Sequence, residues 1–410
     1  MQKPQGPIIP VLLGADLNCY TMARAFYEAY GAFSYAFGKT PLGATRGARF
    51  IRFRAVPSLG DGALCLQTLS DFAARMRGKG RLFLVPCTDE YAYFLIDRQA
   101  QLRRDYLFSV PPRRFLSYFD KDIFYDACAR YKIPFPETVV FSSSPTDSAL
   151  AGALARLGLP VIVKPSSSRA YWRHPFSGME KVYLAENAEQ TRKILSDIFS
   201  SGYPSRVLLQ KYLPGGDAAA ATLTVYSDRT GHVRLRAYAD VLLEEHTPCG
   251  KGNYAALLTA PVPPIADKIC AFLEAEHYVG FANFDLRRGE SGALFVLEMN
   301  LRQGRSSHFL TAGGQNPARW LVRDLTDMPL PQRDMDTPVL FRTVPRGVLR
   351  HYAPDPARLS VAERLFGTES EATPCGGDFL RSYSLRRAAY LAFHAMRERQ
   401  KFRRFATRMR

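Results

Sequence analysis

The chain has 410 residues, of which 47% are hydrophobic and 23% charged; these are the values of a folded globular protein and exclude a wholly disordered chain. This length is enough for two or three structural units. No apolar run approaches the length of a membrane span, and the N-terminus shows no signal-peptide pattern. Seven scattered cysteines without a C-x-x-C pair favour free thiols in a reducing compartment, so we expect a cytoplasmic protein.

The formal net charge of +17 is unevenly distributed. Residues 381–410 contain ten lysines or arginines and a single glutamate, so this segment alone supplies about half of the excess. The remaining positive charge is spread along the chain. Such a surplus suits a protein that handles anionic ligands, without identifying them.

The first part of the chain alternates strand-like and helical patterns. An apolar run at 8–16 precedes a helical pattern that ends at Gly31. Further strands are expected at 32–37 and 81–86, with a helix at 71–77. This alternation predicts a parallel α/β unit over residues 1–110, ending before Pro111-Pro112.

Polar residues follow the predicted strands of this unit. Such strand ends are where α/β proteins often bind ligands, but a helix cap or turn role is the better explanation for each of these residues. Gly14 is isolated, so the sequence predicts no Rossmann-type dinucleotide site. The polar residues concerned are Asp16, Asn18, Asp89 and Glu90.

Two lysines in the middle of the chain lie where a phosphate could bind. Lys121 stands at a helix start, where a positive charge opposes the helix dipole unless an anion or solvent accommodates it. Lys164 ends an apolar β-branched strand at 159–164, at the mouth of what could be a cleft. A long polar segment, 166–181, follows. Beyond it we expect strands at 182–184, 207–213, 222–226 and 233–239, a polar loop at 240–253 and helices at 190–199 and 266–277.

Residues 281–307 carry the strongest chemical signal. Two short apolar runs around a Gly-bearing turn predict a β-hairpin. Side chains alternate along a strand, so Glu298 and Asn300 share a face, and pairing can bring Asp285 beside them. Carboxylates on an apolar hairpin are costly to bury unless neutralised, and Mg²⁺ with a nucleotide's phosphates does this. A hairpin whose acids face water is the alternative.

In chain order, residues 8–327 resemble the ATP-grasp ligases. The resemblance implies an α/β and α+β fold: an N-terminal parallel α/β domain (1–110), a first ATP-grasp subdomain with the phosphate loop (111–205), a second with the metal hairpin (206–330), and a C-terminal extension with a basic amphipathic helix (331–410). The loop at 166–181 departs from the glycine-rich family pattern, because serines, Arg169, Arg173 and His174 replace most glycines.

The resemblance also implies ATP and Mg²⁺ as cofactors, with Mn²⁺ as an alternative ion. The implied metal ligands are Asp285, Glu298 and Asn300. Arg302, Arg305 and Lys164 are the implied catalytic residues, the arginines binding or orienting a substrate carboxylate; pairing with neighbouring acids is their other role. The implied nucleotide-binding residues are Lys121, Lys164, Ser166, Ser167, Ser168, Gln210, Lys211, Tyr212, Leu213 and Asp217.

ATP-grasp ligases activate a carboxylate as an acylphosphate, which an amine then attacks. The motifs at 164–183 and 300–318 look most like D-aspartate ligases, which implies addition of D-aspartate to a peptidoglycan precursor stem peptide. Two alternatives stay open: a ligase that makes a small peptide-like metabolite from soluble amino acids, and a non-catalytic nucleotide-binding scaffold at a membrane. The sequence predicts no oligomeric state.

The basic tail contains apolar residues at helical spacing, among them Leu385, Phe393 and Met396. A basic amphipathic helix is typical of elements that bind an anionic membrane surface. It is equally typical of a helix docked on the protein body with a solvated arginine face. We therefore expect a cytoplasmic protein, either free or peripheral on the inner membrane face. No nucleic-acid partner is expected, because base-reading motifs are missing.

Overall fold

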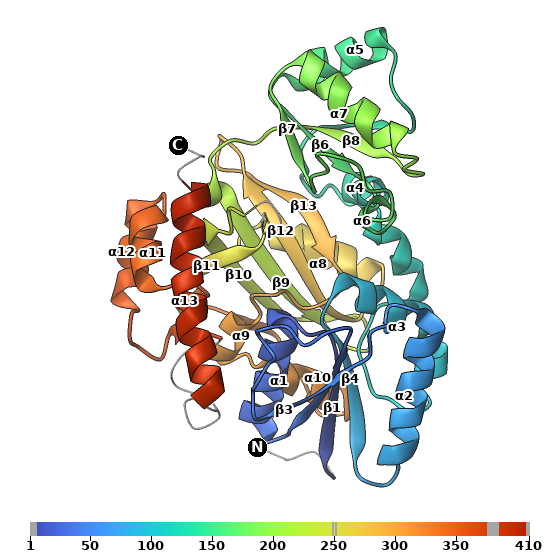
Figure 1. The fold of residues 1–410 in the computed structure, drawn as a ribbon, viewed down its shortest axis with the longest axis vertical. Coiled ribbons are helices and arrows are strands. Elements are labelled where there is room, and N and C mark those ends of the chain that lie inside the picture. The colour runs from blue at the N-terminus through green and yellow to red at the C-terminus, as the bar shows by residue number, and fades with distance from the viewer. Residues whose placement is uncertain (1–5, 248–249, 251, 375–384, 407–410) are drawn as a thin grey trace.

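The computed structural model describes residues 6–247, 250, 252–374 and 385–406. Three β-sheets organise it (Figure 1). The N-terminal sheet is parallel, with strand order β3-β2-β1-β4, as the alternating pattern predicts. The predicted helix at 71–77 is longer and starts earlier than expected. The strands of the N-terminal unit are β1 (Ile8–Leu13), β2 (Ser34–Gly38), β3 (Ile51–Ala55) and β4 (Arg81–Pro86). Its helices are α1 (Leu17–Tyr30), α2 (Gly62–Met76) and α3 (Asp89–Leu102).

Helix α1 begins and ends where its local chemistry dictates. The Asp16 carboxylate accepts a hydrogen bond from the Cys19 backbone N–H at 3.1 Å and caps the helix start. Gly31 ends the helix in the left-handed conformation, at φ 65°, which glycine adopts without a steric penalty. The predicted stop at Gly31 is confirmed.

The second sheet is small and antiparallel, with strand order β5-β8-β6-β7. It forms the upper part of the molecule in Figure 1, where α5 and α7 lie against it. Strand β8 belongs to this sheet although it follows residue 205, the predicted boundary between subdomains. The elements are the 3-10 helix η1 (Arg113–Phe119), α4 (Lys121–Arg130), β5 (Thr138–Phe141), α5 (Asp147–Leu157), β6 (Val161–Pro165), α6 (Ser168–Tyr171), β7 (Tyr183–Ala185), α7 (Ala188–Ser200) and β8 (Val207–Lys211).

The third sheet is the largest and occupies the centre of the molecule (Figure 1). Its strands follow the order β13-β12-β9-β10-β11-β15-β16, and β14 pairs with β10. The sheet continues past residue 330 through β15 and β16. The elements are η2 (Asp217–Ala219), β9 (Ala220–Ser227), β10 (Val233–Glu244), β11 (Tyr254–Thr259), α8 (Ile265–Ala275), β12 (Gly280–Arg288), β13 (Leu294–Asn300), α9 (His308–Ala312), α10 (Pro317–Leu325), β14 (Arg333–Asp334), β15 (Leu340–Arg342) and β16 (Glu371–Ala372).

One prediction for this sheet is wrong. Residues 240–244 were expected to begin a polar loop, but they form the end of β10. The pairing of β10 with β11 is irregular between Val241 and Glu244, which hides the period-two pattern. Asp240 is tolerated there because Arg288 pairs with it at 3.0 Å.

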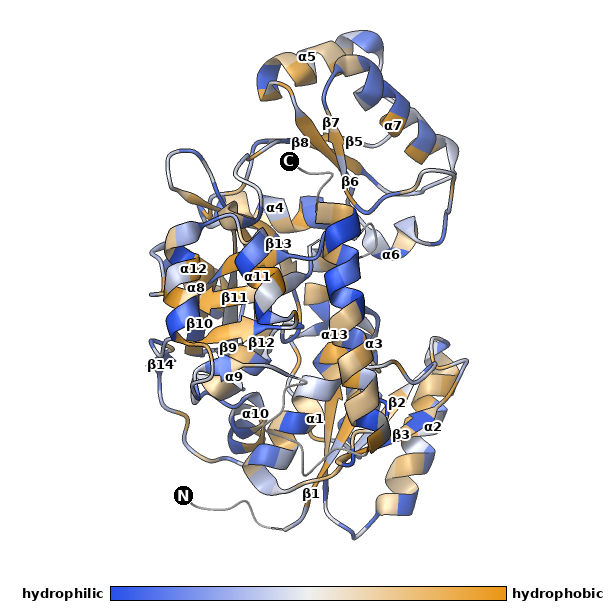
Figure 2. Cartoon of the chain, turned by 60° about the vertical axis from the view of Figure 1, so that its left-hand side comes forward, coloured by the Kyte–Doolittle hydropathy of each residue, from blue (hydrophilic) through white to orange (hydrophobic). Residues whose placement is uncertain are grey.

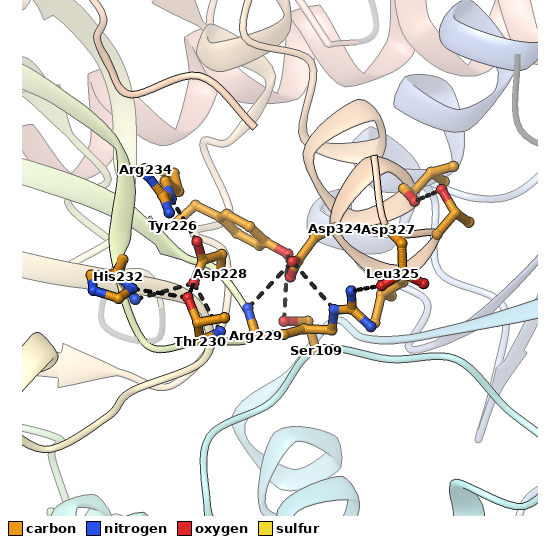
Figure 3. Close-up of polar contacts among 12 residues, drawn as sticks. Ser109, Tyr226, Asp228, Arg229, Thr230, His232, Arg234, Asp324, Leu325 and Asp327 are labelled. Atoms are coloured by element: carbon orange, nitrogen blue, oxygen red, sulfur yellow. Dashed lines mark hydrogen bonds and ion pairs between the residues drawn. The ribbon is translucent and has the colours of Figure 1, made fainter. Parts of the chain in front are cut away.

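A polar junction helps to join the central sheet to the helices beside it (Figure 3). The buried Tyr226 hydroxyl donates to Asp324 at the end of α10, at 2.7 Å. Arg229, in the turn after β9, also contacts Asp324, at 3.5 Å. Because these partners come from segments about a hundred residues apart, we assign this cluster a structural role.

The C-terminal segment covers one edge of the central sheet with α11 (Arg346–Tyr352), α12 (Pro356–Arg364) and α13 (Leu385–Phe405). The predicted tail helix is confirmed over α13, and it docks on the body. Phe402 is buried against Tyr352, with ring centroids 5.5 Å apart. Figure 2 shows that hydrophilic residues gather in the later turns of this helix and apolar residues in its earlier turns. Across the described ranges we find no helix with the combined length and apolarity needed to cross a bilayer.

Candidate active site

The hairpin predicted at 281–300 is present as β12 and β13, and its register brings the predicted metal ligands together. Asp285 pairs directly with Glu298, and Asn283 pairs with Asn300. Side chains of directly paired residues lie on the same face of a sheet. Two carboxylates therefore face the same space, flanked by two amides.

Asp285 is held by neutral donors. The Tyr254 hydroxyl donates to it at 2.7 Å, and the Asn300 side-chain amide at 3.3 Å. Burial, followed by the negative charge of Glu298, raises the pKa of Asp285 to about 6. Among the described residues, Asp285 therefore has no ion-pair partner.

Glu298 has the opposite environment. Its carboxylate lies 2.9 Å from the ammonium of Lys121, which also donates to Ser168 at 3.2 Å. Burial alone would raise the pKa of Glu298, but the charges of Lys121 and Lys181 outweigh it and hold the pKa at about 2. Because Lys121 opens α4 and Glu298 lies on β13, this ion pair also links the second sheet to the third.

Lys164 lies at the end of β6, as predicted, and is fully surrounded by protein. Its ammonium donates to the Tyr125 hydroxyl at 2.8 Å, and Gln210 donates to the same hydroxyl at 3.1 Å. Burial lowers the pKa of Lys164 to about 8, although the charge of Glu298 opposes this change. A phosphate near this lysine would favour its charged form.

Asp285, Glu298 and Asn300 line a cleft with a volume of about 440 Å³, together with residues of α3, α6 and β11. Lys121 lines a small pocket beside Glu298, and Lys164 lines neither space. The carboxylate pair lies on one wall. Lys181 and Ser168 come from the segment after β6, and Arg302 and Arg305 from the segment after β13. A cleft of this size accommodates a nucleotide or a small substrate.

The donor set fits a hard cation that also binds phosphate oxygens. Among the described residues, no group of three or more His, Cys, Asp or Glu side chains could hold a metal ion. The hairpin instead offers two carboxylates and the amide of Asn300. Mg²⁺ is commonly held by one or two carboxylates together with substrate phosphates and water, so the residues fit this ion.

The two predicted catalytic arginines both line the cleft, and both are paired with acids. Arg302 contacts Asp89, the first residue of α3, at 2.8 Å. Arg305 contacts Glu245 at 3.3 Å, and its Nη1 is buried without a hydrogen-bond partner. Among the described residues, Nη1 of Arg305 therefore has a proton that it can still donate to a ligand.

Some of the predicted nucleotide-binding residues already have hydrogen-bond partners within the protein, and others are exposed. Ser166 is fully buried and donates to Asp122, so its hydroxyl proton is not free for a phosphate. The Ser167 backbone N–H donates to Tyr203 at 2.9 Å, and Ser168 faces Lys121. The Gln210 side-chain amide donates to the Tyr125 hydroxyl, and the Leu213 carbonyl accepts a hydrogen bond from Arg287. Lys211 is exposed, and Tyr212 is half-buried.

Asp217, which the sequence places near a ribose, is already hydrogen-bonded. It accepts from the Glu244 backbone N–H at 2.9 Å and pairs with His246 at 2.8 Å. This contact raises the pKa of His246, and burial raises that of Glu244 to about 7. His246 thus supports an acidic cluster at the edge of the site.

Several cleft residues were missed by the sequence analysis. Lys181 lies in the irregular segment after α6, and the charge of Glu298 raises its pKa. Tyr254 reaches Asp285 from β11, which β9 and β10 separate from β12. Asn283, Arg169 and Trp172 also line the cleft. The position of Lys181 at the end of a polar, Gly-bearing segment was the only sequence signal for any of these residues. No sequence pattern indicated Tyr254.

Comparisons with known proteins place this architecture in a family. No protein-family model matches the chain. A curated D-aspartate ligase from Enterococcus faecium (strain Aus0004) is 30% identical to it over 367 residues, which cover 87% of each protein.

Solved structures share the fold at low sequence identity. The biotin carboxylase domain of Hydrogenobacter thermophilus 2-oxoglutarate carboxylase, in complex with MgADP, ADP and bicarbonate, aligns with a TM-score of 0.59 at 15% identity and covers 78% of this chain and 70% of its own. The L-amino acid ligase from Bacillus licheniformis aligns with a TM-score of 0.54 at 13% identity, over 79% and 75% of the two chains. The chain therefore belongs to the same family as the D-aspartate ligase, among the ATP-dependent carboxylate–amine ligases of the ATP-grasp fold.

Proposed function

We propose that the protein joins D-aspartate to the side-chain amine of a peptidoglycan precursor stem peptide, at the expense of ATP. The observation that carries the proposal is the pairing of Asp285 with Glu298 at a cleft, with the positive charges of Lys121, Lys181 and Lys164 acting on Glu298. The D-aspartate ligase at 30% identity supports the choice of substrates. Membership of a ligase family favours this activity over a non-catalytic scaffold.

The proposed reaction has two steps. An oxygen of the β-carboxylate of aspartate attacks the γ-phosphorus of ATP, forming an acylphosphate and releasing ADP. The amine nitrogen then attacks the acyl carbon, phosphate leaves, and the nitrogen loses a proton to form the amide. Both steps need charge balance around phosphate groups and a fixed orientation of the carboxylate.

We assign charge balance and substrate orientation to residues in the cleft and beside it. Lys121, Lys164 and Lys181 bind phosphate oxygens. Asp285, Glu298 and Asn300 hold Mg²⁺, or Mn²⁺ in its place; when bound, the ion neutralises the negative charge that phosphates bring beside two carboxylates. The unpartnered nitrogen of Arg305 binds a carboxylate oxygen, and Asp89 orients Arg302 toward the same region.

We also propose that the protein works in the cytoplasm, peripherally attached to anionic membrane. The support is the solvent-facing side of α13, where Phe393 is 51% and Met396 50% exposed beside Leu385 at 93%. Sedimentation with phosphatidylglycerol vesicles tests this: the wild type should sediment, and a Phe393→Glu/Met396→Glu variant should remain in the supernatant. Equal recovery of both proteins in the supernatant overturns it.

The function itself is tested by measuring ADP and phosphate released from MgATP. We expect release that requires both D-aspartate and a stem peptide, and loss of that release in Glu298→Ala. Release with soluble L-amino acids alone would instead identify a ligase that makes a small metabolite. If ATP binds but no combination of amino acid and stem peptide releases phosphate, the proposal is overturned.

A further inference from the structure

A second and larger cavity lies beside the active-site cleft. Its volume is about 820 Å³, and Arg305 lines both spaces. Glu245, the ion-pair partner of Arg305 at 3.3 Å, lines the larger cavity beside this shared residue. Asp16, at the end of the first strand of the N-terminal sheet, lines the same cavity. Asp285, Glu298 and Asn300 do not line this second cavity.

Helix α13 forms one side of the second cavity and is anchored at both ends. At its start, the fully buried Arg387 donates to the carbonyl oxygens of Gly43 at 2.7 Å and Arg46 at 2.9 Å. At its end, Phe402 is buried against Tyr352 and the ring of His246.

The middle of α13 spans the cavity between these two anchors. Tyr390, His394 and Glu398 line it from this helix. The helix therefore bridges the N-terminal unit and the central sheet, and it covers the cavity without filling it.

The charges in the cavity suit a ligand with a cationic amine and an anionic part. Asp16 and Glu245 are carboxylates on the side that meets the cleft, where an ammonium would be attracted before it reacts. Arg399 lines the cavity from α13, is solvent-exposed, and has no ion-pair partner among the described residues. It is placed to pair with a carboxylate on the more remote part of such a ligand.

The size of the cavity separates two classes of amine. A single free amino acid would need only a small part of 820 Å³, whereas a peptide of several residues can fill a space of this size. A large, charged cavity also gives binding energy from parts of the substrate that are remote from the reacting atoms. The geometry therefore discriminates between the stem-peptide and free-amino-acid alternatives.

We infer that this cavity under α13 is the binding site for the amine substrate, and that it selects a short peptide carrying a primary amine and a carboxylate. The amine lies at the side shared with the cleft, near Glu245, and Arg399 binds a carboxylate of the peptide. The inference rests on the proposed function and adds to it the location and class of the second substrate.

Two substitutions test the site, with a matched control on the same helix. Arg399→Glu reverses a charge inside the cavity, and Ala395→Trp fills part of its volume. Arg397→Glu makes the same charge change on an exposed residue that lines neither cavity. We expect the first two variants to raise KM for a lysine-containing stem pentapeptide by about tenfold or more, and the control to leave it within about twofold.

A small nucleophile separates this inference from the function on which it rests. Hydroxylamine needs no large cavity, so hydroxamate formation from D-aspartate and MgATP reports the acylphosphate step alone. Wild type and all three variants should form hydroxamate at similar rates. In the wild type, KM for the pentapeptide should lie at least about tenfold below that for free L-lysine, and Ala395→Trp should remove the difference.

The outcomes are distinct. Normal hydroxamate formation with an unchanged pentapeptide KM in both cavity variants would overturn the amine site and leave the proposed function standing. Absence of hydroxamate in the wild type would overturn the proposed function and this inference with it. Circular dichroism and melting of each variant exclude misfolding as the cause of a raised KM.

Discussion

Asp285 and Glu298 lie opposite each other on the β12–β13 hairpin, yet their pKa values are displaced in opposite directions, to about 6 and about 2. The difference follows from their partners. Glu298 has the ammonium of Lys121 at 2.9 Å, whereas Asp285 has a tyrosine hydroxyl and an amide. Lys121 thus neutralises one carboxylate, and we propose that a bound cation neutralises the other.

We predict that Asp285→Asn stabilises the metal-free protein and weakens its binding of MgATP. Removing one of two facing carboxylates relieves a repulsion and a burial cost worth about 1–3 kcal/mol, judged from the displaced pKa. Thermal unfolding in EDTA should occur at a higher temperature in the variant than in wild type. Adding MgATP should reverse the order, because only the wild type retains both ligands.

An Asp285→Asn protein that melts earlier than wild type in EDTA would contradict this explanation. It would mean that the hydrogen bonds from Tyr254 and Asn300 outweigh the repulsion between the two carboxylates.

Lys164 gives a pH dependence whose sign is fixed by its pKa of about 8, below the ordinary 10.5. Between these values the folded protein binds fewer protons than the unfolded chain, so the buried ammonium costs stability below pH 8, and that stability is regained as pH rises. ATP binding should have the opposite trend. Its Kd should increase above about pH 8 as the charge that pairs with phosphate is lost.

Tyr125→Phe removes the hydroxyl that accepts from Lys164 at 2.8 Å, and should lower the midpoint of this transition by about half to one pH unit. Tyr131→Phe is the matched control, because it removes the hydroxyl of a tyrosine at the end of α4 that donates to Glu276. Equilibrium binding of ATP from pH 6.5 to 9.5 measures both. A midpoint that moves upward in Tyr125→Phe would be inconsistent with this role of the hydroxyl.

Asp89 is predicted to act as a positioning residue for Arg302. Asp89→Asn should lower kcat/KM for the carboxylate substrate by about tenfold, with the Kd of ATP nearly unchanged, because the Asp89 carboxylate accepts a charged hydrogen bond 2.9 Å long that holds the guanidinium. Asp97→Asn, on the same helix and paired with Arg113 at the surface, should have no effect. Steady-state kinetics with each substrate varied separately distinguish misorientation of the carboxylate substrate from weaker binding of the nucleotide.

Gly304 is predicted to be intolerant of any side chain. An alanine Cβ there would lie 2.7 Å from Oδ1 of Asn283, which also accepts from Thr222 at 3.1 Å and Thr224 at 3.0 Å. Asn283 cannot move without losing these bonds, so Gly304→Ala should reduce turnover by about tenfold or more and stability by about 1–2 kcal/mol.

Gly152→Ala is the control for this substitution. Gly152 lies within α5, has open space around its Cβ position, and should tolerate alanine with a small gain in stability. Chemical denaturation and turnover assays on both variants provide the comparison, and wild-type turnover in Gly304→Ala would show that Asn283 can adapt.

The part of the site that depends on local pattern was predictable from sequence. Strand alternation alone places Glu298 and Asn300 on one face, and a short Gly-bearing turn limits the register that brings Asp285 to them. Lys164 was found because it ends a β-branched run. Each of these signals lies within about twenty residues of sequence.

The remainder depends on contacts between distant segments. Tyr254 reaches Asp285 only because β9 and β10 set the spacing between β11 and β12. The amphipathic pattern of α13 is compatible both with a membrane and with the protein body. Its docking is fixed by Arg387 meeting the carbonyl of Gly43, more than three hundred residues earlier. No local pattern encodes such a pair.

The separation of α13 from the nucleotide cleft has an evolutionary consequence. Much of the wall of the larger cavity is contributed by residues after 340, whereas the carboxylate pair and the lysines lie between 121 and 298. Substitutions in the later segment can therefore alter which amine is accepted while the phosphate chemistry is preserved. Homologues that diverge mainly in this segment should bind the same nucleotide and differ in their amine substrate. The family can therefore acquire new products through changes in the C-terminal segment, while the catalytic centre stays the same.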